Sequence, residues 1–366
     1  MLIGIGGAGS KLSSTFDGGS NVVINISEAE LNKAKAAQRI LAVVHSGRGK
    51  REGAKKNPEI GKTAFISIKD QLEDMVRGNT VITSTGGGTG MGITWKVLES
   101  IAQKDDVPEE EKTTFILVLP YADREPSEYV DNTIQFISQP VSWAIDSGNT
   151  GNVFLVSNKE KFVNRMTEAE FNGLIARRFN AFFQIPAKCE EHASLEGHID
   201  REDFSLYLSK PYFNYFVDFD YEHKKPLDEQ LASNTNRLML EPDTPLEAMF
   251  LLEVPNHADE RMFYDVLDHF ESRNVVPIYA VVRNPNLQVP HLTLSLLYAR
   301  KPHDLVNDFI RISEKRTRDK IRKSIEQHGT FGPKKVNLEQ EAMKEAMKAG
   351  KKEDEVISVL KRIGKL

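Results

Sequence analysis

Two glycine-rich segments of the sequence contain residue types that could hold phosphate groups. The first is GIGGAG at residues 4–9, and the second is TSTGGGTGMG at residues 83–92. Backbone N–H groups at closely spaced glycines can approach phosphate oxygens, and a threonine adds a hydroxyl; the second segment has Gly86, Gly87, Gly88, Thr89 and Gly90. A tight turn would account for one or two of these glycines but not for the cluster. We therefore predict that this segment is a phosphate-binding loop.

The first segment alone allows an alternative. GIGGAG matches the G-x-G-x-x-G fingerprint of NAD(P)- or FAD-dependent oxidoreductases, which require an acidic residue at the end of the second strand to hold the ribose. Here that strand ends Asn25-Ile26-Ser27, and Glu28 comes slightly late. Neither segment is a Walker A loop, because no G-K-[ST] follows. Two glycine loops in one domain indicate a ligand with several phosphates.

A pair of carboxylates also has spacing suited to chemistry. Asp200 and Asp203 lie in EGHIDREDF, at residues 196–204. Taken locally, they predict a helix N-cap and an acidic first turn. Carboxylates so placed can also accept hydrogen bonds from water and orient it for attack on a phosphate. The nine histidines are scattered without metal-ligand spacing, so we predict no metal site built from side chains.

The elements that position these residues follow from the hydrophobic pattern. Strands are predicted at residues 2–5, 21–27, 39–45, 79–85, 113–120 and 152–157, with helices between them, and a long loop at 47–62. This alternation predicts an α/β fold of the Rossmann-like type, a parallel sheet with helices on both faces and ligands at the carboxyl ends of the strands. A long helix follows, beginning at a capping box of Thr167 and Glu170 and bent or interrupted at Pro186.

Beyond the long helix the pattern changes. Strands at 214–221, 247–255, 274–284 and 291–301, with a helix at 259–273, predict a smaller mixed α/β domain. From residue 304 the chain becomes helical and basic, breaks at HGTFGP, and ends in a second amphipathic helix. We predict four parts: a nucleotide-binding domain at 1–166, a central helix and acidic loop at 167–204, the mixed domain at 205–302, and basic C-terminal helices at 303–366.

Composition narrows the class of protein. Hydrophobic residues make up 40% and charged residues 28%, which is ordinary for a soluble globular protein. No apolar run is long enough for a transmembrane helix, so we expect no membrane partner. A single cysteine, Cys189, excludes an internal disulfide framework and favours the cytoplasm. Residues 311–366 carry 16 Lys/Arg and 9 Asp/Glu within a chain of net charge −5, so the basic C-terminal segment predicts a different partner from the acidic body.

These motifs, in this order, resemble the tubulin/FtsZ superfamily. The signature GGGTG-[ST]-G of that family stands at residues 86–92, with Met91 in place of Ser or Thr. The resemblance implies that GTP or GDP binds at residues of both glycine loops, of an N-P-E-x-G loop and of a ribose loop whose acid is displaced. In this sequence the implied contacts outside the second loop are Gly6, Gly7, Ala8, Asn25, Asn57, Asp123 or Glu125, and Asn158. Asn172 is the implied guanine contact, with Asn180 as second choice.

The same resemblance implies a GTPase whose site is split between subunits. In the family, the loop that contains Asp200 and Asp203 here enters the nucleotide site of the next subunit and positions the attacking water. Glu202 is the fallback, and His198 stands where the family usually has Asn. Such a heterologous contact gives head-to-tail filaments. Mg²⁺ would bridge the phosphates and be held mostly by phosphate and water, with no dedicated protein ligands.

The basic C-terminal segment looks more like the plasmid- and phage-encoded tubulin relatives than like cell-division members or eukaryotic tubulins. That resemblance implies a filament that moves or positions DNA, through a DNA-bound adaptor protein that contacts the basic helices. A solvated helix face, and docking on another subunit through Val356, Ile357, Val359, Leu360 and Ile363, are the other two interpretations of the segment. An FtsZ-like cell-division protein and a nucleotide-binding structural protein without hydrolysis remain alternatives for the whole chain.

Overall fold

The chain divides into two compact units, residues 1–314 and 315–366. The computed structural model describes residues 1–16, 20–46, 49–240, 244–299 and 303–328. Of the second unit it therefore describes only the end of one helix, α14 (His303–His328). The predicted second C-terminal helix, with its apolar stripe, lies outside the described residues.

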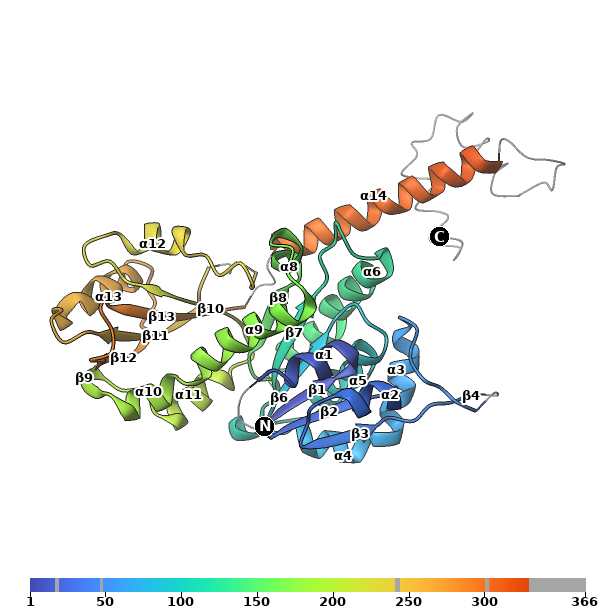
Figure 1. Ribbon diagram of the computed structural model, residues 1–366, viewed down its shortest axis with the longest axis horizontal. Helices are drawn as coiled ribbons and strands as arrows, with labels where there is room; N and C mark the ends of the chain where they lie inside the picture. Colours follow the sequence, from blue (N-terminus) through green and yellow to red (C-terminus); the bar gives the residue numbers. More distant parts are fainter. Residues whose placement is uncertain (17–19, 47–48, 241–243, 300–302, 329–366) are drawn as a thin grey trace. The chain divides into compact units, whose positions relative to one another are not determined.

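One 11-stranded sheet runs through the first unit, in the order β3-β2-β1-β6-β7-β8-β10-β13-β11-β12-β9 (Figure 1). Strands β3 to β10 are parallel neighbours, as the alternating pattern predicts. The pairs β10–β13, β13–β11 and β12–β9 are antiparallel, whereas β11–β12 is parallel. The two halves join where Phe213 and Asn214 of β10 pair with Val153 and Phe154 of β8. The predicted mixed domain therefore extends the first sheet, and the boundary at residue 205 stays a prediction.

The strands of this sheet have the following bounds: β1 Leu2–Ile5, β2 Asn21–Asn25, β3 Gln38–Leu41, β6 Thr80–Ser84, β7 Thr114–Leu119, β8 Val153–Ser157, β9 Ala193–Gly197, β10 Phe213–Asp220, β11 Glu247–Val254, β12 Ile278–Arg283 and β13 His291–Tyr298. A separate hairpin pairs β4 (His45–Ser46) with β5 (Gly49–Lys50). Each strand predicted from the hydrophobic runs is confirmed, because those runs supply the buried side chains of the sheet.

The helices of the first unit have the following bounds: α1 Gly6–Ser13, α2 Glu28–Lys33, α3 Pro58–Phe65, α4 Lys69–Val76, α5 Thr89–Ala102, α6 Ser127–Phe136, α7 Ser142–Asp146, α8 Lys159–Val163, α9 Glu168–Phe183, α10 Ile185–Glu191, α11 Arg201–Leu208, α12 Leu227–Ser233 and α13 Phe263–Glu271. The predicted interruption at Pro186 is confirmed, since α9 ends at Phe183 and α10 begins at Ile185. In the described part of the chain no helix is both long and apolar enough to cross a membrane.

Three local expectations need correction. The loop predicted at 47–62 ends early, because Asn57 caps α3, its side chain accepting a hydrogen bond from the Glu59 N–H at 2.9 Å, and Pro58 opens the helix. β9 was not predicted, since its side chains are mostly exposed and give no apolar signal. α12 was also missed, although a proline at its N-cap and acids in its first turn are helix-start signals.

An aromatic cluster fixes the central helix α9 to the junction between the two halves of the sheet. Phe182 of α9 stacks on Phe216 of β10 with ring centroids 4.5 Å apart, and Phe179 meets Phe154 of β8 edge-on at 5.2 Å. These rings are fully buried. Burial of apolar surface on this scale stabilises the join, so α9 is held against both β8 and β10.

Candidate functional site

The two glycine loops lie directly against each other. They follow β1 and β6, which are parallel neighbours in the sheet. Gly6 has φ +75°, and a Cβ at that position would lie 2.6 Å from the Gly90 nitrogen. A Cβ at Gly90 would lie 2.8 Å from the Ile5 carbonyl oxygen. The sheet therefore brings the start of α1 and the start of α5 to one place.

Close packing explains why glycine is needed at most of the glycine positions in the second glycine loop, residues 83–92. A Cβ at Gly86 would lie 2.7 Å from Cβ of Tyr129, one at Gly88 would lie 2.8 Å from the Asn57 nitrogen, and one at Gly92 would lie 2.1 Å from the Pro58 carbonyl oxygen. Only Gly87 has room, with Ser84 Oγ at 3.4 Å as its nearest described neighbour. The expectation that a structural need explains only one or two glycines is therefore wrong: close backbone packing requires most of them.

A cavity of about 410 Å³ opens beside these loops. Most of the predicted site residues line it, namely Gly7, Ala8, Asn25, Gly86, Gly87, Gly88, Thr89, Gly90, Glu125, Asn158 and Asn172. Among the described residues, the lining does not include Gly6, Asn57, Asp123, Asn180, Asp200 or Asp203. Met91, which stands where the family signature has Ser or Thr, lies in α5 with its side chain fully buried. This difference from the signature therefore lies in the hydrophobic core and not in the cavity lining.

The helices that begin at this cavity are suited to an anion. Neither α1 nor α5 has a side-chain cap or an acidic residue in its first turn, among the residues described. By contrast, side chains cap α2, α3, α9 and α11, and each of these helices has acids in its first turn. The uncapped N–H groups and the positive end of the helix dipole at α1 and α5 can therefore bind phosphate.

A buried asparagine holds a carboxylate beside the first glycine loop. The Asn25 Nδ2 atom donates to Glu30 Oε2 at 2.6 Å, and its Oδ1 accepts from the Ile26 N–H at 2.8 Å. Ser27 caps α2, because its Oγ accepts a hydrogen bond from the Glu30 N–H. Glu30 Oε2 lies 2.9 Å from where a Gly7 Cβ would be. Glu30 lines the cavity and was not predicted.

Glu125, in the segment between β7 and α6, is the acid of that segment that lines the cavity. Its carboxylate accepts from the Tyr121 N–H at 2.6 Å and from Asn158 Nδ2 at 3.1 Å. Asp123 is exposed and lies by Tyr121. Partial burial, followed by the charge of Asp123, raises the pKa of the Tyr121 hydroxyl above its usual value. Of the two acids that the sequence left open, the structure brings only Glu125 together with Asn158.

The start of α9 forms another wall of the cavity. Asn172 and Phe171 line it, together with Glu168, which forms an ion pair at 2.9 Å with Lys11 of α1. Asn180 lies about two turns further along the same helix. The capping box predicted at Thr167 and Glu170 is confirmed, and it sets where this helix begins. Further lining residues that the sequence did not single out are Leu12, Glu52, Lys55, Tyr129 and Lys161.

Asp200 and Asp203 lie at the start of α11, outside this cavity. Asp200 Oδ1 accepts a hydrogen bond from the Asp203 N–H at 2.8 Å, so the local interpretation as N-cap and first turn holds. Ile199, just before them, is fully buried. The segment 198–203 is therefore anchored by one apolar side chain while the Asp203 carboxylate is exposed to solvent.

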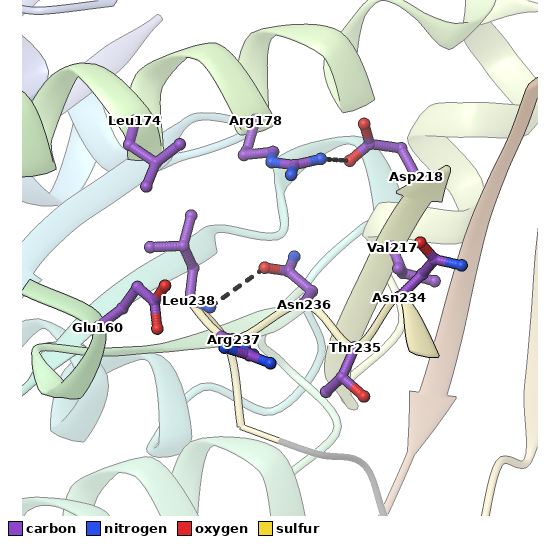
Figure 2. Close-up of a pocket in the computed structure, with 10 residues that line it drawn as sticks. All are labelled: Glu160, Leu174, Arg178, Val217, Asp218, Asn234, Thr235, Asn236, Arg237 and Leu238. Carbon is purple, nitrogen blue, oxygen red and sulfur yellow. Dashed lines mark hydrogen bonds and ion pairs between the residues drawn. The ribbon is translucent and has the colours of Figure 1, made fainter. Parts of the chain in front are cut away.

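A second, smaller cavity of about 180 Å³ lies between α9, the end of β10 and the segment after α12. Figure 2 shows the ion pair of Arg178 and Asp218 along one side of it, with Glu160 and Arg237 on the opposite side. Asn236 uses its side chain on the protein itself, donating to the Phe216 carbonyl at 2.7 Å and accepting from the Leu238 N–H. The lining contains charges of both signs, and the Asn236 amide is already hydrogen-bonded within the protein. This cavity therefore favours no particular class of ligand.

Comparison with known proteins agrees with this geometry. No protein-family model matches the chain. A TubZ structure from Bacillus thuringiensis serovar israelensis, a GTPγS-form protofilament, is 13% identical with a TM-score of 0.70, covering 88% of this chain and 93% of that one. TubZ of Clostridium botulinum phage c-st is 18% identical with a TM-score of 0.62, covering 86% and 98%. An FtsZ from M. jannaschii is 19% identical with a TM-score of 0.57, covering 81% and 87%.

At these identities the likeness establishes the fold rather than the activity. It extends over most of the length of both chains. The chain therefore has the fold of the tubulin/FtsZ superfamily, with clear likeness to TubZ structures.

Proposed function

We propose that this protein binds and hydrolyses GTP and assembles head-to-tail into filaments. The observation that carries the proposal is the cavity itself. Two uncapped helix N-termini and two glycine loops open into it at one side, and Asn172, Asn158 and Glu125 line it as well. This arrangement suits a polyphosphate joined to a sugar and a base.

Each part of the nucleotide would have its own contacts. The N–H groups at the starts of α1 and α5 bind the phosphates, because no side chain caps these helices and the close contact of the two glycine loops brings both helix starts to one place. Glu125, held by Asn158, accepts hydrogen bonds from ribose hydroxyls. The Asn172 amide recognises the guanine edge, since it offers both a donor and an acceptor.

Hydrolysis would need a second copy of the chain. Asp200 and Asp203 lie outside the cavity of their own chain, and the Asp203 carboxylate is exposed at the start of α11. Docked on the cavity of a neighbour, these carboxylates orient the attacking water toward the γ-phosphate. The comparison structures support self-association, because TubZ is described in protofilaments and in a two-stranded filament.

Mg²⁺ fits the cavity through a single carboxylate. No group of three or more His, Cys, Asp or Glu able to hold a metal occurs among the described residues. Glu30 supplies oxygen beside Gly7 and is oriented by Asn25, which suits a hydrated, nucleotide-bound Mg²⁺. The ion would neutralise charge on the β- and γ-phosphates.

An oxidoreductase is less well supported. That reading requires an acid at the end of β2 to hold a ribose. Glu28 lies outside the cavity lining and pairs with Lys50 at 3.3 Å. Glu30 does line the cavity, but its carboxylate is bonded to Asn25 and lies beside Gly7 of the first glycine loop, where phosphate rather than ribose would bind. In addition, a dinucleotide bound at the first glycine loop, residues 4–9, would leave the second glycine loop, residues 83–92, without a ligand-binding role. These observations favour GTP over NAD(P) or FAD.

A role in DNA positioning is the narrower form of the proposal. It is supported by the likeness to TubZ, including that of a phage, and by the basic charge of residues 311–366. We propose that the filament acts on plasmid or phage DNA through an adaptor protein that contacts the basic C-terminal helices. Pull-down of a DNA-bound adaptor by the full chain, and its loss on neutralising Arg316, Arg318 and Lys320, would test this.

The main experiment combines light scattering with phosphate release. With GTP the protein should scatter more light and release phosphate, and Asp200→Ala with Asp203→Ala should assemble but release phosphate at least about tenfold more slowly. Hydrolysis by that double variant at the parental rate would refute the catalytic assignment. Tight NADH binding without GTP binding would refute the proposal as a whole, and assembly of the parent without phosphate release would favour a structural nucleotide-binding protein.

A further inference from the structure

Four buried polar side chains form a closed network of hydrogen bonds where the two halves of the sheet join. The Tyr207 hydroxyl of α11 donates to Ser295 Oγ at 3.2 Å, and Ser295 Oγ donates to Asn214 Oδ1 at 2.9 Å. Asn214 Nδ2 donates to Asn152 Oδ1 at 2.7 Å, and Asn152 Nδ2 donates back to the Tyr207 carbonyl at 3.1 Å. Each of the four residues is 0% exposed. This set, called the buried network below, therefore begins and ends on one residue of α11.

Hydrogen bonds in the buried network can be donated in one direction only. An amide oxygen can only accept, so the Ser295 hydroxyl gives its proton to Asn214 and accepts from Tyr207. Burial raises the pKa of the Tyr207 hydroxyl above its usual value, so this hydroxyl keeps its proton and remains a donor. Bonds that point the same way round reinforce one another, and a buried member without its partner is costly. The network therefore holds its members in one arrangement.

The buried network attaches α11 to both halves of the sheet. Tyr207 lies in α11, Ser295 lies in β13 of the second half, and Asn152 comes just before β8 of the first half. Asn152 also holds the C-terminal end of α11, because its N–H donates to the Leu208 carbonyl at 2.7 Å and its Nδ2 donates to the Lys210 carbonyl at 2.8 Å. The last carbonyls of a helix have no partner within the helix. Directional bonds from the first half of the sheet thus fix this end of α11.

The N-terminal end of α11 has less directional contacts. Asp200 is the N-cap there, and the Asp203 carboxylate is exposed. Phe204 packs on aromatic rings of α9, a contact that is apolar and non-directional. The ion pair of Arg201 with Glu190 is exposed, so it orients the helix only weakly. Because α11 has eight residues and is about 12 Å long, a rotation or tilt at its C-terminal end would move the carboxylates at the other end.

Packing alone does not explain why these four residues are polar. Apolar groups of the same shape can replace both partners of a buried hydrogen bond at little or no cost. A fully bonded polar network adds direction, since it rigidifies its surroundings and selects one geometry. The position of the network, at the fixed end of the helix that begins with Asp200, indicates which geometry that is.

We propose that the buried network positions the acidic loop, residues 198–203, by fixing the rotation and tilt of α11. Tyr207 and Asn152 are then positioning residues for hydrolysis, since they touch neither nucleotide nor water and act through Asp200 and Asp203. The inference rests on the proposed function, because it assumes that those two carboxylates orient the attacking water in the site of a neighbouring copy.

GTP turnover per assembled subunit, compared with nucleotide binding and assembly, tests this. Tyr207→Phe removes one oxygen and opens the network, and it should lower turnover by about tenfold, because a misplaced catalytic group loses rate steeply. The affinity for GDP, and the protein concentration at which GTPγS drives assembly, should each change by less than about twofold, since neither needs the attacking water. Ser295→Ala opens the network at β13 and should give the same result.

A comparison of two backgrounds separates positioning from a general loss of structure. If Tyr207 acts through the acidic loop, adding Tyr207→Phe to Asp200→Ala with Asp203→Ala should lower the remaining turnover by less than about twofold. A change that only weakened the fold or the filament would lower turnover by the same factor in both backgrounds. Equal factors would therefore overturn the inference.

Tyr215→Phe is the matched control on β10. It also removes one buried hydroxyl, which accepts from the Asn236 N–H at 2.8 Å, but that bond lies outside the buried network. This variant should lower the urea midpoint of unfolding as Tyr207→Phe does, while its GTP turnover stays at the parental value.

Several results would overturn the inference while leaving the proposed function intact. They are parental turnover in Tyr207→Phe and Ser295→Ala, an equal loss of turnover in Tyr215→Phe, a loss of GDP affinity or of assembly that matches the loss of turnover, and failure of both network variants to fold. If only one network variant folds, that variant decides. If the parental chain does not hydrolyse GTP, the proposed function fails, and this inference fails with it.

Discussion

Asn172 and Asn180 lie on one helix, and either could have been the base contact. The structure places Asn172 in the cavity lining and Asn180 outside it, about two turns further along α9. The segment between β7 and α6 gives a second case, since Glu125 bonds Asn158 in the cavity lining whereas Asp123 is exposed. At the scale of single residues, neighbours in the fold decide which of two similar side chains lines the cavity.

Asn172→Ala should weaken GDP binding by about 1–3 kcal/mol, because a base edge buried against the alanine would lose its hydrogen-bond partner. Titration calorimetry with GDP measures the change. Asn180→Ala serves as the control on the same helix and should bind GDP as the parent does. Equal losses in the two variants would count against the guanine assignment.

At the scale of elements, α3 and α5 pack through paired glycines. A Cβ at Gly92 would lie 2.7 Å from Cα of Gly61 and 2.1 Å from the Pro58 carbonyl. This close approach sets where α5, and hence its N-terminus at the cavity, lies relative to the loop before α3. Glycine in these helices therefore serves helix packing.

Gly92→Ala should lower the free energy of unfolding by about 1–3 kcal/mol, the cost of overpacking at a backbone contact. Gly173→Ala is the matched control in α9, since no described heavy atom lies within 4 Å of its Cβ position. There alanine should stabilise the helix by up to about 1 kcal/mol. Urea unfolding followed by circular dichroism measures both, and a neutral Gly92→Ala would show that α3 and α5 can separate freely.

A buried ion pair fastens α10 to the second half of the sheet. Lys188 Nζ lies 2.5 Å from Glu253 Oε2, and the Glu253 side chain is 3% exposed. Asn284 Nδ2 donates to the other carboxylate oxygen at 2.8 Å. Among the residues that the structure describes, the carboxylate thus has two hydrogen-bond partners, of which only Lys188 carries charge.

Lys188→Met should cost about 3 kcal/mol of unfolding free energy, because it leaves the Glu253 carboxylate buried without a cation. Adding Glu253→Met should recover most of that loss, since an apolar pair of similar volume can replace a buried ion pair. Denaturant titrations of the single and double variants measure the coupling between the two sites. Additive losses would show that the pair contributes little.

At the scale of the whole molecule, the cavity and the acidic loop belong to one chain but lie apart. Gly197, which ends β9 just before that loop, has φ +59° and leaves no room for a Cβ, which would meet the Tyr279 carbonyl at 2.4 Å. β9 pairs with β12 at the far edge of the sheet. The loop is therefore held on the half of the sheet opposite to the glycine loops, which is compatible with the proposed site shared between copies.

GTP turnover per subunit should rise with protein concentration and level off only when most subunits are assembled, because each site needs a neighbour. Phosphate release measured over a concentration series tests this. When Asp200→Ala subunits are mixed with parental subunits, GTP turnover per parental subunit should fall by more than it does when the parental protein is diluted with buffer to the same concentration. Turnover per subunit that is independent of concentration would place the catalytic groups within one chain.

Much of the fold follows from local patterns. Short runs of β-branched apolar residues become the buried strands, because a sheet is where their side chains are removed from water. The side chains of Ser27, Thr167 and Asp200 cap helices through hydrogen bonds to residues three positions further along the chain, so these helix starts are local as well. The polar strand β9 could not be predicted with the same rules, since it is defined by its partner β12 rather than by its own side chains. Helix α12, by contrast, has helix-start signals of its own.

The sequence by itself determined the two glycine loops, their places after strands, and the order of motifs that resembles the tubulin/FtsZ superfamily, because each depends on residues close together in the chain. Tertiary structure alone decided that the loops touch through Gly6 and Gly90, that Glu125 and Asn172 enter the cavity, and that Lys55 lines it while Asn57 caps a helix. These outcomes depend on the order of strands in the sheet and on side-chain contacts between distant segments, which no local pattern encodes.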